Sequence, residues 1–133
     1  MVRLKFTQGI KASDVQSIRQ SVQAEATEVG LSAQQGFVII FVVDELVCNV
    51  MEHSRATSME LAIEADAHGF QCRLVDDGIA FDTAESIEEA TQVEIQGQGE
   101  RRLGLNLIGR LVDKVHYVRA PDGTNQVDLS KAW

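Results

Sequence analysis

The sequence predicts a two-layer α/β (α+β) sandwich, in which a mixed, largely antiparallel sheet carries helices on one face. Three observations predict this fold. Several short runs alternate apolar and polar residues as strands do, and longer runs between them repeat apolar residues at helical spacing. Four of the strands form two pairs, each joined by a short turn, which favours antiparallel hairpins over a doubly wound sheet. At 133 residues the chain is expected to be a single domain spanning 1–133.

The first half of the chain predicts one strand and two helices. "VRLKF" alternates like a short strand, and Ser13 is expected to cap a helix that runs to about Val29 and ends at Gly30. Ser32 is expected to cap a second helix that reaches His53. The first helix has one apolar stripe, which is expected to cover the sheet, with a dimer contact as the alternative: Val15, Ile18, Val22 and Ala26.

The second half predicts two hairpins with a helix between them. "SMELAIEAD" and "FQCRLVD" alternate on either side of "AHG", and "VHYVRA" and "QVDLSKA" flank the turn "PDGTN". Between them, "LGLNLIGRLVDKV" has helical spacing from Leu103 to Val115. The predicted order is therefore strand, helix, helix, two strands, helix, two strands.

The composition limits which kinds of partner and which cellular location are expected. The net charge of −8 lacks the clustered positive footprint that a nucleic-acid backbone requires, so no direct nucleic-acid binding is expected. Cys48 and Cys72 lack paired metal-ligand spacing and are interpreted as buried thiols in a reducing cytosol. The N-terminus has no signal-type core, and the longest apolar run, 37–43, is too short to cross a bilayer. A cytoplasmic protein without a membrane anchor is expected.

The segment "DELVCNVMEH" places polar residues within an apolar helix. Helical spacing puts Glu45, Asn49 and either Glu52 or His53 on one face. A buried polar group without a partner costs several kcal/mol as an order of magnitude. A ligand would satisfy these groups, and the alternative is that this face of the helix is simply exposed to water.

Two further segments have the residue types of a ligand site. In "LVDDGIAFD" a strand ends at Asp76, whose carboxylate would accept a hydrogen bond from an amine, and Gly78 would let a flat ring approach the backbone. An ordinary turn is the alternative. In "QGQGERRLGLNLIGR" glycines precede a helix whose N-terminus favours an anion such as phosphate, and the alternative is a flexible linker.

Together, "DELVCNVMEH", "DDGIAFD", "LGLNLIGRLVDKVHY" and "DGTNQVDLSK" resemble the Bergerat-fold (GHKL-type) ATPases, a group that includes gyrase and histidine kinases. Within that group the chain is most similar to the small anti-sigma-factor serine/threonine kinases of bacterial partner-switching systems. The resemblance implies the Bergerat ATP-binding fold, the cofactors ATP and Mg²⁺, and two protein partners, a sigma factor and an anti-anti-sigma antagonist. It also suggests a homodimer.

The resemblance implies a role for each matching residue. Glu45 matches the general base, Asn49 the Mg²⁺ ligand, and His53 a residue that orders the pocket. Asp76 matches the aspartate that binds the adenine amine, and Gly78 the glycine beside the ring. The remaining nucleotide-binding residues would lie in the glycine-bearing loop and the last hairpin: Gly99, Arg102, Gly104, Leu105 and Thr124, with Asn125 as the alternative to Thr124.

Two positions depart from the family pattern. Ala80 replaces a second glycine of the motif after the adenine aspartate. Arg102 replaces the glycine that begins Gly-Leu-Gly-Leu in many relatives. With arginine there, either the loop surrounds the phosphates more loosely or Arg102 itself contacts a phosphate. The leading hypothesis is a kinase that binds a regulatory partner and phosphorylates its antagonist. The alternatives are a non-catalytic nucleotide- or protein-binding switch on the same fold and a detached domain that phosphorylates histidine.

Overall fold

The computed structural model describes residues 1–80 and 107–133. In chain order the elements are β1 (Val2–Phe6), α1 (Ala12–Glu28), α2 (Ala33–Asn49), the π-helical turn η1 (Val50–Ser54), β2 (Met59–Asp66), β3 (Gly69–Asp76), β4 (Lys114–Arg119) and β5 (Asn125–Ala132). Residues 107–111 are also helical and precede β4, so the predicted order of elements is confirmed. None of the described helices is long and apolar enough to cross a membrane.

The strands form one five-stranded sheet in the order β1-β2-β3-β5-β4. Every pairing between described strands is antiparallel, and both predicted hairpins, β2–β3 and β4–β5, are present. The two hairpins join where β3 pairs with β5. In that register the last residue of β3, Asp76, lies opposite the first residue of β5, Asn125.

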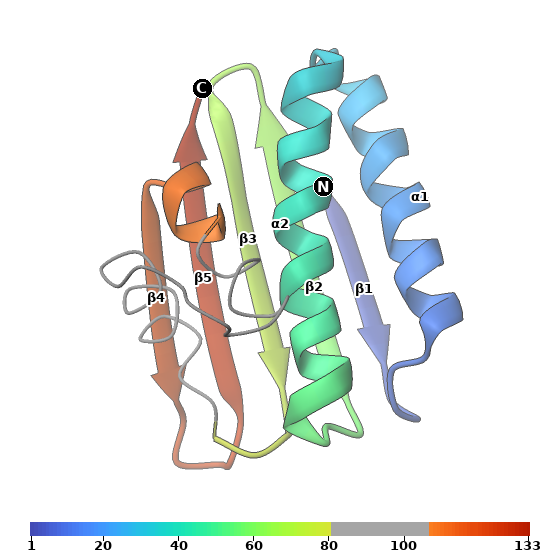
Figure 1. Cartoon of the computed structure of the whole chain (residues 1–133), viewed down its shortest axis with the longest axis vertical. Coiled ribbons are helices and arrows are strands. Elements are labelled where there is room, and N and C mark those ends of the chain that lie inside the picture. The colour runs from blue at the N-terminus through green and yellow to red at the C-terminus, as the bar shows by residue number, and fades with distance from the viewer. Residues whose placement is uncertain (81–106) are drawn as a thin grey trace, which may run out of the picture.

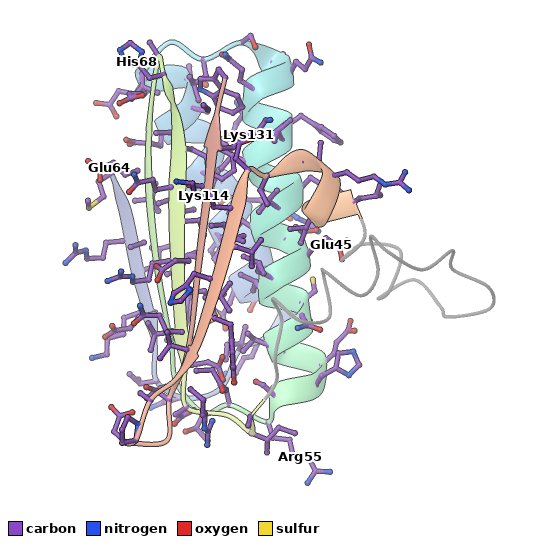
Figure 2. The ribbon with its side chains drawn as sticks, turned by 90° about the vertical axis from the view of Figure 1, so that its left-hand side faces the viewer. Glu45, Arg55, Glu64, His68, Lys114 and Lys131 are labelled. Carbon is purple, nitrogen blue, oxygen red and sulfur yellow. The ribbon has the colours of Figure 1, made fainter. Side chains whose placement is uncertain are left out.

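The elements form two layers. Figure 1 shows α1 and α2 side by side across one face of the sheet, with the 107–111 helix on the same face near β5. In the edge-on view of Figure 2 the described helices all lie on one side of the sheet, and the other side carries exposed side chains. The predicted two-layer sandwich with helices on one face is confirmed.

The hydrophobic core fills the space between the two layers. The predicted stripe of α1 is buried in full: Val15, Ile18, Val22 and Ala26. It meets α2 and the inner face of the sheet, where the most completely buried side chains include Ile39, Val42, Val47, Leu61, Leu74 and Ile108. The outer face of the sheet is polar and includes two cross-strand ion pairs, Lys5–Glu60 and Arg73–Asp128.

The two helix starts differ in how far they match the prediction. Ser32 caps α2 as expected, because its hydroxyl accepts a hydrogen bond from the Gln35 N–H at 3.1 Å. Ser13 was the wrong cap for α1. The N-cap is Lys11, whose backbone N–H donates to Asp14 Oδ2 at 2.8 Å, so Ser13 lies within the first turn.

Two helix ends also differ from the prediction. The α-helical part of α2 ends at Asn49, and the chain reaches His53 through a π-helical turn. Val115 was expected to continue a helix but lies in β4. The chain joins the sheet just before this residue, because the Asp113 N–H donates to the Ser130 carbonyl at 2.9 Å.

The cysteines are both free thiols but differ in burial. Cys72 is buried in the core, and this burial raises the pKa of its thiol to about 12. Cys48 is only partly buried, so the prediction of two buried thiols is confirmed for Cys72 alone.

Candidate functional site

Buried polar side chains gather at one place in the described part of the chain. The buried polar residues of 1–80 and 107–133 are Asn49, Ser54, Asp76 and Asn125. All of them line one internal cavity of about 10 Å³, together with apolar Leu46, Val50, Leu74 and Val127. Because each buried polar group without a partner costs about 1–3 kcal/mol, their convergence marks a candidate site rather than a random feature of the core.

The π-helical turn at the end of α2 selects which residues reach the cavity. A π-helical turn bonds i to i+5, so it contains one residue more than an α-helical turn. Asn49 ends α2 and Ser54 ends η1, and both are buried. His53 instead points outward with its side chain 38% exposed, and its Nε2 lies 3.6 Å from Glu52 Oε2. The structure therefore brings Ser54, and not His53, to the cavity beside Asn49.

Asp76 is the buried carboxylate of the site. Its Oδ1 accepts hydrogen bonds from the Gly78 N–H at 2.8 Å and from Asn125 Nδ2 at 3.0 Å. Its Oδ2 accepts none from the residues that the structure describes. Burial raises the pKa of the Asp76 carboxyl, and the hydrogen bonds from Asn125 and Gly78 act in the opposite direction. Among the described residues, hydrogen bonds thus reach only one oxygen of this buried acid.

Gly78 lies where the chain after β3 crosses the π-helical turn. A Cβ atom at this position would lie 2.3 Å from the Ser54 carbonyl oxygen and 2.7 Å from its Oγ. The same carbonyl oxygen accepts a hydrogen bond from the Ile79 N–H at 2.7 Å. The structure thus supplies a second reason for glycine at position 78, because only glycine fits against Ser54.

Asn125 connects β5 to the turn after β3. Its Nδ2 donates to Asp76 Oδ1 at 3.0 Å and to the Ile79 carbonyl at 2.9 Å. Thr124 instead directs its Oγ1 to Asp122 Oδ1 at 2.7 Å, within the β4–β5 turn. Of the two candidate residues in the last hairpin, Asn125 is therefore the one that contacts Asp76.

The acidic residues of α2 have different environments. Both oxygens of Asp44 accept hydrogen bonds from Arg19 of α1, each at 2.8 Å, so this charge belongs to a contact between helices. Glu45 is partly buried and lies one helical turn before Asn49. Figure 2 shows it on the side of α2 that faces away from the sheet.

Part of the site inferred from the sequence lies outside the described residues. This part comprises Gly99, Arg102, Gly104 and Leu105. Among the residues that are described, no group of three His, Cys, Asp or Glu side chains could hold a metal ion. The ligand that the sequence suggests for a metal at this site is the side-chain oxygen of Asn49.

Two residues of β4 belong to the site and were not anticipated from sequence. Tyr117 Oη donates to Asn125 Oδ1 at 2.8 Å, and Arg119 Nη1 donates to the same oxygen at 3.0 Å and to the Gly78 carbonyl at 2.8 Å. The alternation of side chains along β4 gives a weak sequence signal for these two residues. Val115, Tyr117 and Arg119 share one face, and an arginine there departs from the apolar pattern.

Comparison with known proteins identifies the family. Residues 10–131 match the model of the histidine kinase-like ATPase domain. No curated protein sequence matches the chain significantly.

Solved structures with this fold include a chain of the SiaB–SiaC complex from Pseudomonas aeruginosa. It aligns with 98% of this chain and 89% of its own length, with a TM-score of 0.66 and 15% identity. The structure of the RsbU and RsbW domains of Rv1364c from Mycobacterium tuberculosis aligns with 98% of this chain but only 32% of its own, with a TM-score of 0.59 and 16% identity. At these identities the likeness is one of fold. The match over 10–131 shows that the chain belongs to the histidine kinase-like ATPase domain family.

Proposed function

We propose that the protein is an ATP-dependent serine/threonine kinase of the anti-sigma-factor type, which binds a regulatory partner and phosphorylates that partner's antagonist. The observation that carries the proposal is the convergence of the buried polar side chains on one cavity, where Asp76 keeps one oxygen without a donor from the described residues. Membership of an ATPase-domain family supports a nucleotide as the ligand.

Asp76 fits the adenine end of the nucleotide. An ionised carboxylate only accepts hydrogen bonds, so its Oδ2 suits an exocyclic amine and disfavours a carbonyl group at the same place. Gly78 and Asn125 orient the Asp76 carboxylate through hydrogen bonds to its other oxygen at 2.8 and 3.0 Å. This part of the site would therefore determine which nucleobase binds.

Asn49 and Glu45 would act at the phosphate end. Bound ATP with Mg²⁺ supplies the phosphoryl group and charge neutralisation, and Asn49 offers the oxygen-type ligand that Mg²⁺ prefers. Glu45, one turn earlier on α2, would take the proton of the acceptor hydroxyl. The spacing of four residues keeps both side chains on neighbouring parts of one helix surface.

Protein partners are proposed from the nature of the structural relatives. One relative was solved in a SiaB–SiaC complex, and the other comes from a protein that contains RsbU and RsbW domains. Together with the resemblance of the sequence motifs to the anti-sigma-factor kinases, this supports our proposal of a sigma factor as the regulatory partner and an anti-anti-sigma protein as the phosphorylated antagonist, in the cytoplasm.

A calorimetric titration with ATP, with and without Mg²⁺, tests the nucleotide site. The parent protein should bind ATP more tightly with Mg²⁺, and Asn49→Ala should remove that difference. Glu52→Gln is a suitable control, because its exposed side chain lies near the same helix end but outside the cavity lining. The nucleotide proposal would be abandoned if the parent bound no ATP at millimolar concentration.

Phosphate transfer to the antagonist tests catalysis. Glu45→Gln should slow the transfer of labelled phosphate by about 10²–10⁴-fold, the usual contribution of a general base, while Glu52→Gln leaves it unchanged. Acid-stable label would identify serine or threonine as the acceptor, and acid-labile label would identify histidine. Equal rates for Glu45→Gln and the parent would contradict the assigned role.

One observation favours a second candidate, a non-catalytic nucleotide- or protein-binding switch. The cavity of about 10 Å³ has room for about one water molecule, far less than a nucleobase requires. A protein that regulates by complex formation alone would need no larger space there. ATP binding without transfer, or partner binding without ATP, would identify this function.

A further inference from the structure

The β4–β5 hairpin holds the carboxamide of Asn125 in one orientation. Oδ1 accepts from Tyr117 Oη at 2.8 Å and from Arg119 Nη1 at 3.0 Å. Nδ2 donates to Asp76 Oδ1 at 3.0 Å and more weakly to the Gly78 carbonyl at 3.3 Å. A guanidinium can only donate, and carbonyl and carboxylate oxygens can only accept, so a flipped amide would place like groups against each other. The network therefore determines the amide orientation.

This orientation controls what Asp76 offers to a ligand. The NH₂ of Asn125 and the Gly78 N–H both donate to Oδ1, which leaves Oδ2 as the oxygen without a donor from the described residues. Arg119 fixes both partners of Asp76, since its Nη1 also donates to the Gly78 carbonyl at 2.8 Å. Tyr117 and Arg119 thus act on Asp76 through Asn125 and the turn at Gly78.

We propose that Tyr117 and Arg119 are positioning residues for base selectivity, which they impose by holding the Asn125 NH₂ against Asp76. The inference rests on the proposed nucleotide site. With Asn125 in place, Asp76 stays an acceptor and selects a base that carries an amine, such as adenine. Without its two donors, Asn125 Oδ1 would be buried and unpaired, and the amide would turn away. Asp76 would then lose a donor, take up a proton more readily, and be able to donate to a carbonyl.

Inosine triphosphate tests this selectivity, because it has a carbonyl where ATP has the amine. The dissociation constants of both nucleotides are measured by calorimetry for the parent, Tyr117→Phe, Arg119→Met and the double variant. The parent should prefer ATP by about tenfold or more, the equivalent of about 1.4 kcal/mol. The double variant should lower this preference at least fivefold, by roughly the effect of one lost hydrogen bond. Lys114→Met is the matched control, since it removes an exposed cation from the same strand, and its preference should equal that of the parent.

The ratio of the two constants separates positioning from a general loss of structure. A merely structural role for Tyr117 and Arg119 would weaken both nucleotides equally and leave the ratio unchanged. An unchanged ratio in a parent-like, folded double variant overturns the inference while ATP binding by the parent still supports the proposed function. If the double variant does not fold, the single variants replace it: at least one of them must lower the ratio, and an unchanged ratio in both overturns the inference. A parent that binds neither nucleotide overturns the proposed function itself.

Discussion

Burial of Asp76 lowers the stability of the fold at neutral pH, but it also places a carboxylate where a ligand could bind. The residue is 5% exposed, and burial raises the pKa of its carboxyl above the ordinary value. A raised pKa means that the ionised form is less stable in the folded chain than in the unfolded chain. The contribution of Asp76 to stability is therefore fully present below its unfolded pKa of 3.8 and is lost as pH rises through its folded pKa. Such a residue suits ligand binding better than folding.

Asp76→Asn should separate these two effects. The introduced carboxamide would keep the oxygen that Gly78 and Asn125 contact, but it would replace the available oxygen with an NH₂ group. We expect ATP affinity to fall by about 1–3 kcal/mol, or roughly 5- to 150-fold, while the free energy of unfolding at pH 7 does not fall. Calorimetry and urea unfolding measure the two quantities. An unchanged ATP affinity would show that Asp76 does not contact the base.

Gly78 makes a separate prediction about packing. In Gly78→Ala the new methyl group would meet the Ser54 carbonyl oxygen at 2.3 Å, so the turn or η1 must shift. We expect a loss of about 1–3 kcal/mol in the free energy of unfolding, as for other overpacked sites. Gly36→Ala is the control, because its nearest neighbour, the Ala26 Cβ, is at 3.5 Å, and alanine should stabilise the helix by up to about 1 kcal/mol. Equal effects of the two substitutions in urea unfolding would contradict this packing argument.

Asp77 has the opposite pH dependence to Asp76. Hydrogen bonds from Ser58 and Thr57 lower the pKa of its carboxyl to about 2, so its contribution to stability is present above pH 3.8 and is lost as pH falls toward 2. The side chain is exposed, which limits the contribution to about 1 kcal/mol or less. Urea unfolding of the parent and Asp77→Asn should therefore differ at pH 7 and converge near pH 2. A difference that stays constant with pH would refute the assignment.

At the scale of elements, local signals predicted most of the fold. Ser32 begins α2 because its hydroxyl satisfies a backbone N–H of the first turn, and that signal is visible in the sequence. Both hairpins follow from alternation and turn residues. The π-helical turn could not be predicted, because no local residue pattern requires it. In the structure this turn ends at Ser54, which packs against Gly78 after β3, a contact between segments distant in sequence.

The candidate site, like the fold, was only partly predictable from the sequence. Asn49 was identified as a polar residue in an apolar helix and Asp76 as an aspartate at a strand end before a glycine, and the structure brings both to one cavity. Tyr117 and Arg119 were missed because their hydrogen bonds to Asn125 follow from the register of β4 against β5. His53 has the expected spacing on an α-helix, yet the π-helical turn directs it outward.

At the scale of the whole molecule, sheet topology assembles the site. The order β1-β2-β3-β5-β4 places β5 beside β3, so Asp76 and Asn125 lie opposite each other although 49 positions separate them in the chain. The helical layer then adds Asn49 and Ser54 from above the same end of the sheet. A ligand bound there would connect both layers, and its binding should therefore stabilise the complete fold.

Thermal unfolding with Mg²⁺ and ATP measures how much a bound nucleotide stabilises the fold. A ligand that binds only the folded chain adds about 2.7 kcal/mol at 100 times its dissociation constant, which should raise the Tm by several degrees. Asp76→Asn should reduce this increment at the same nucleotide concentration, to between about 0.3 and 1.8 kcal/mol for the expected loss of affinity. His53→Ala should keep it, because the exposed side chain of His53 lies outside the cavity lining. Loss of the increment in His53→Ala, with Asp76→Asn unaffected, would mean that the nucleotide contacts the outer surface of η1 instead of the cavity between the two layers.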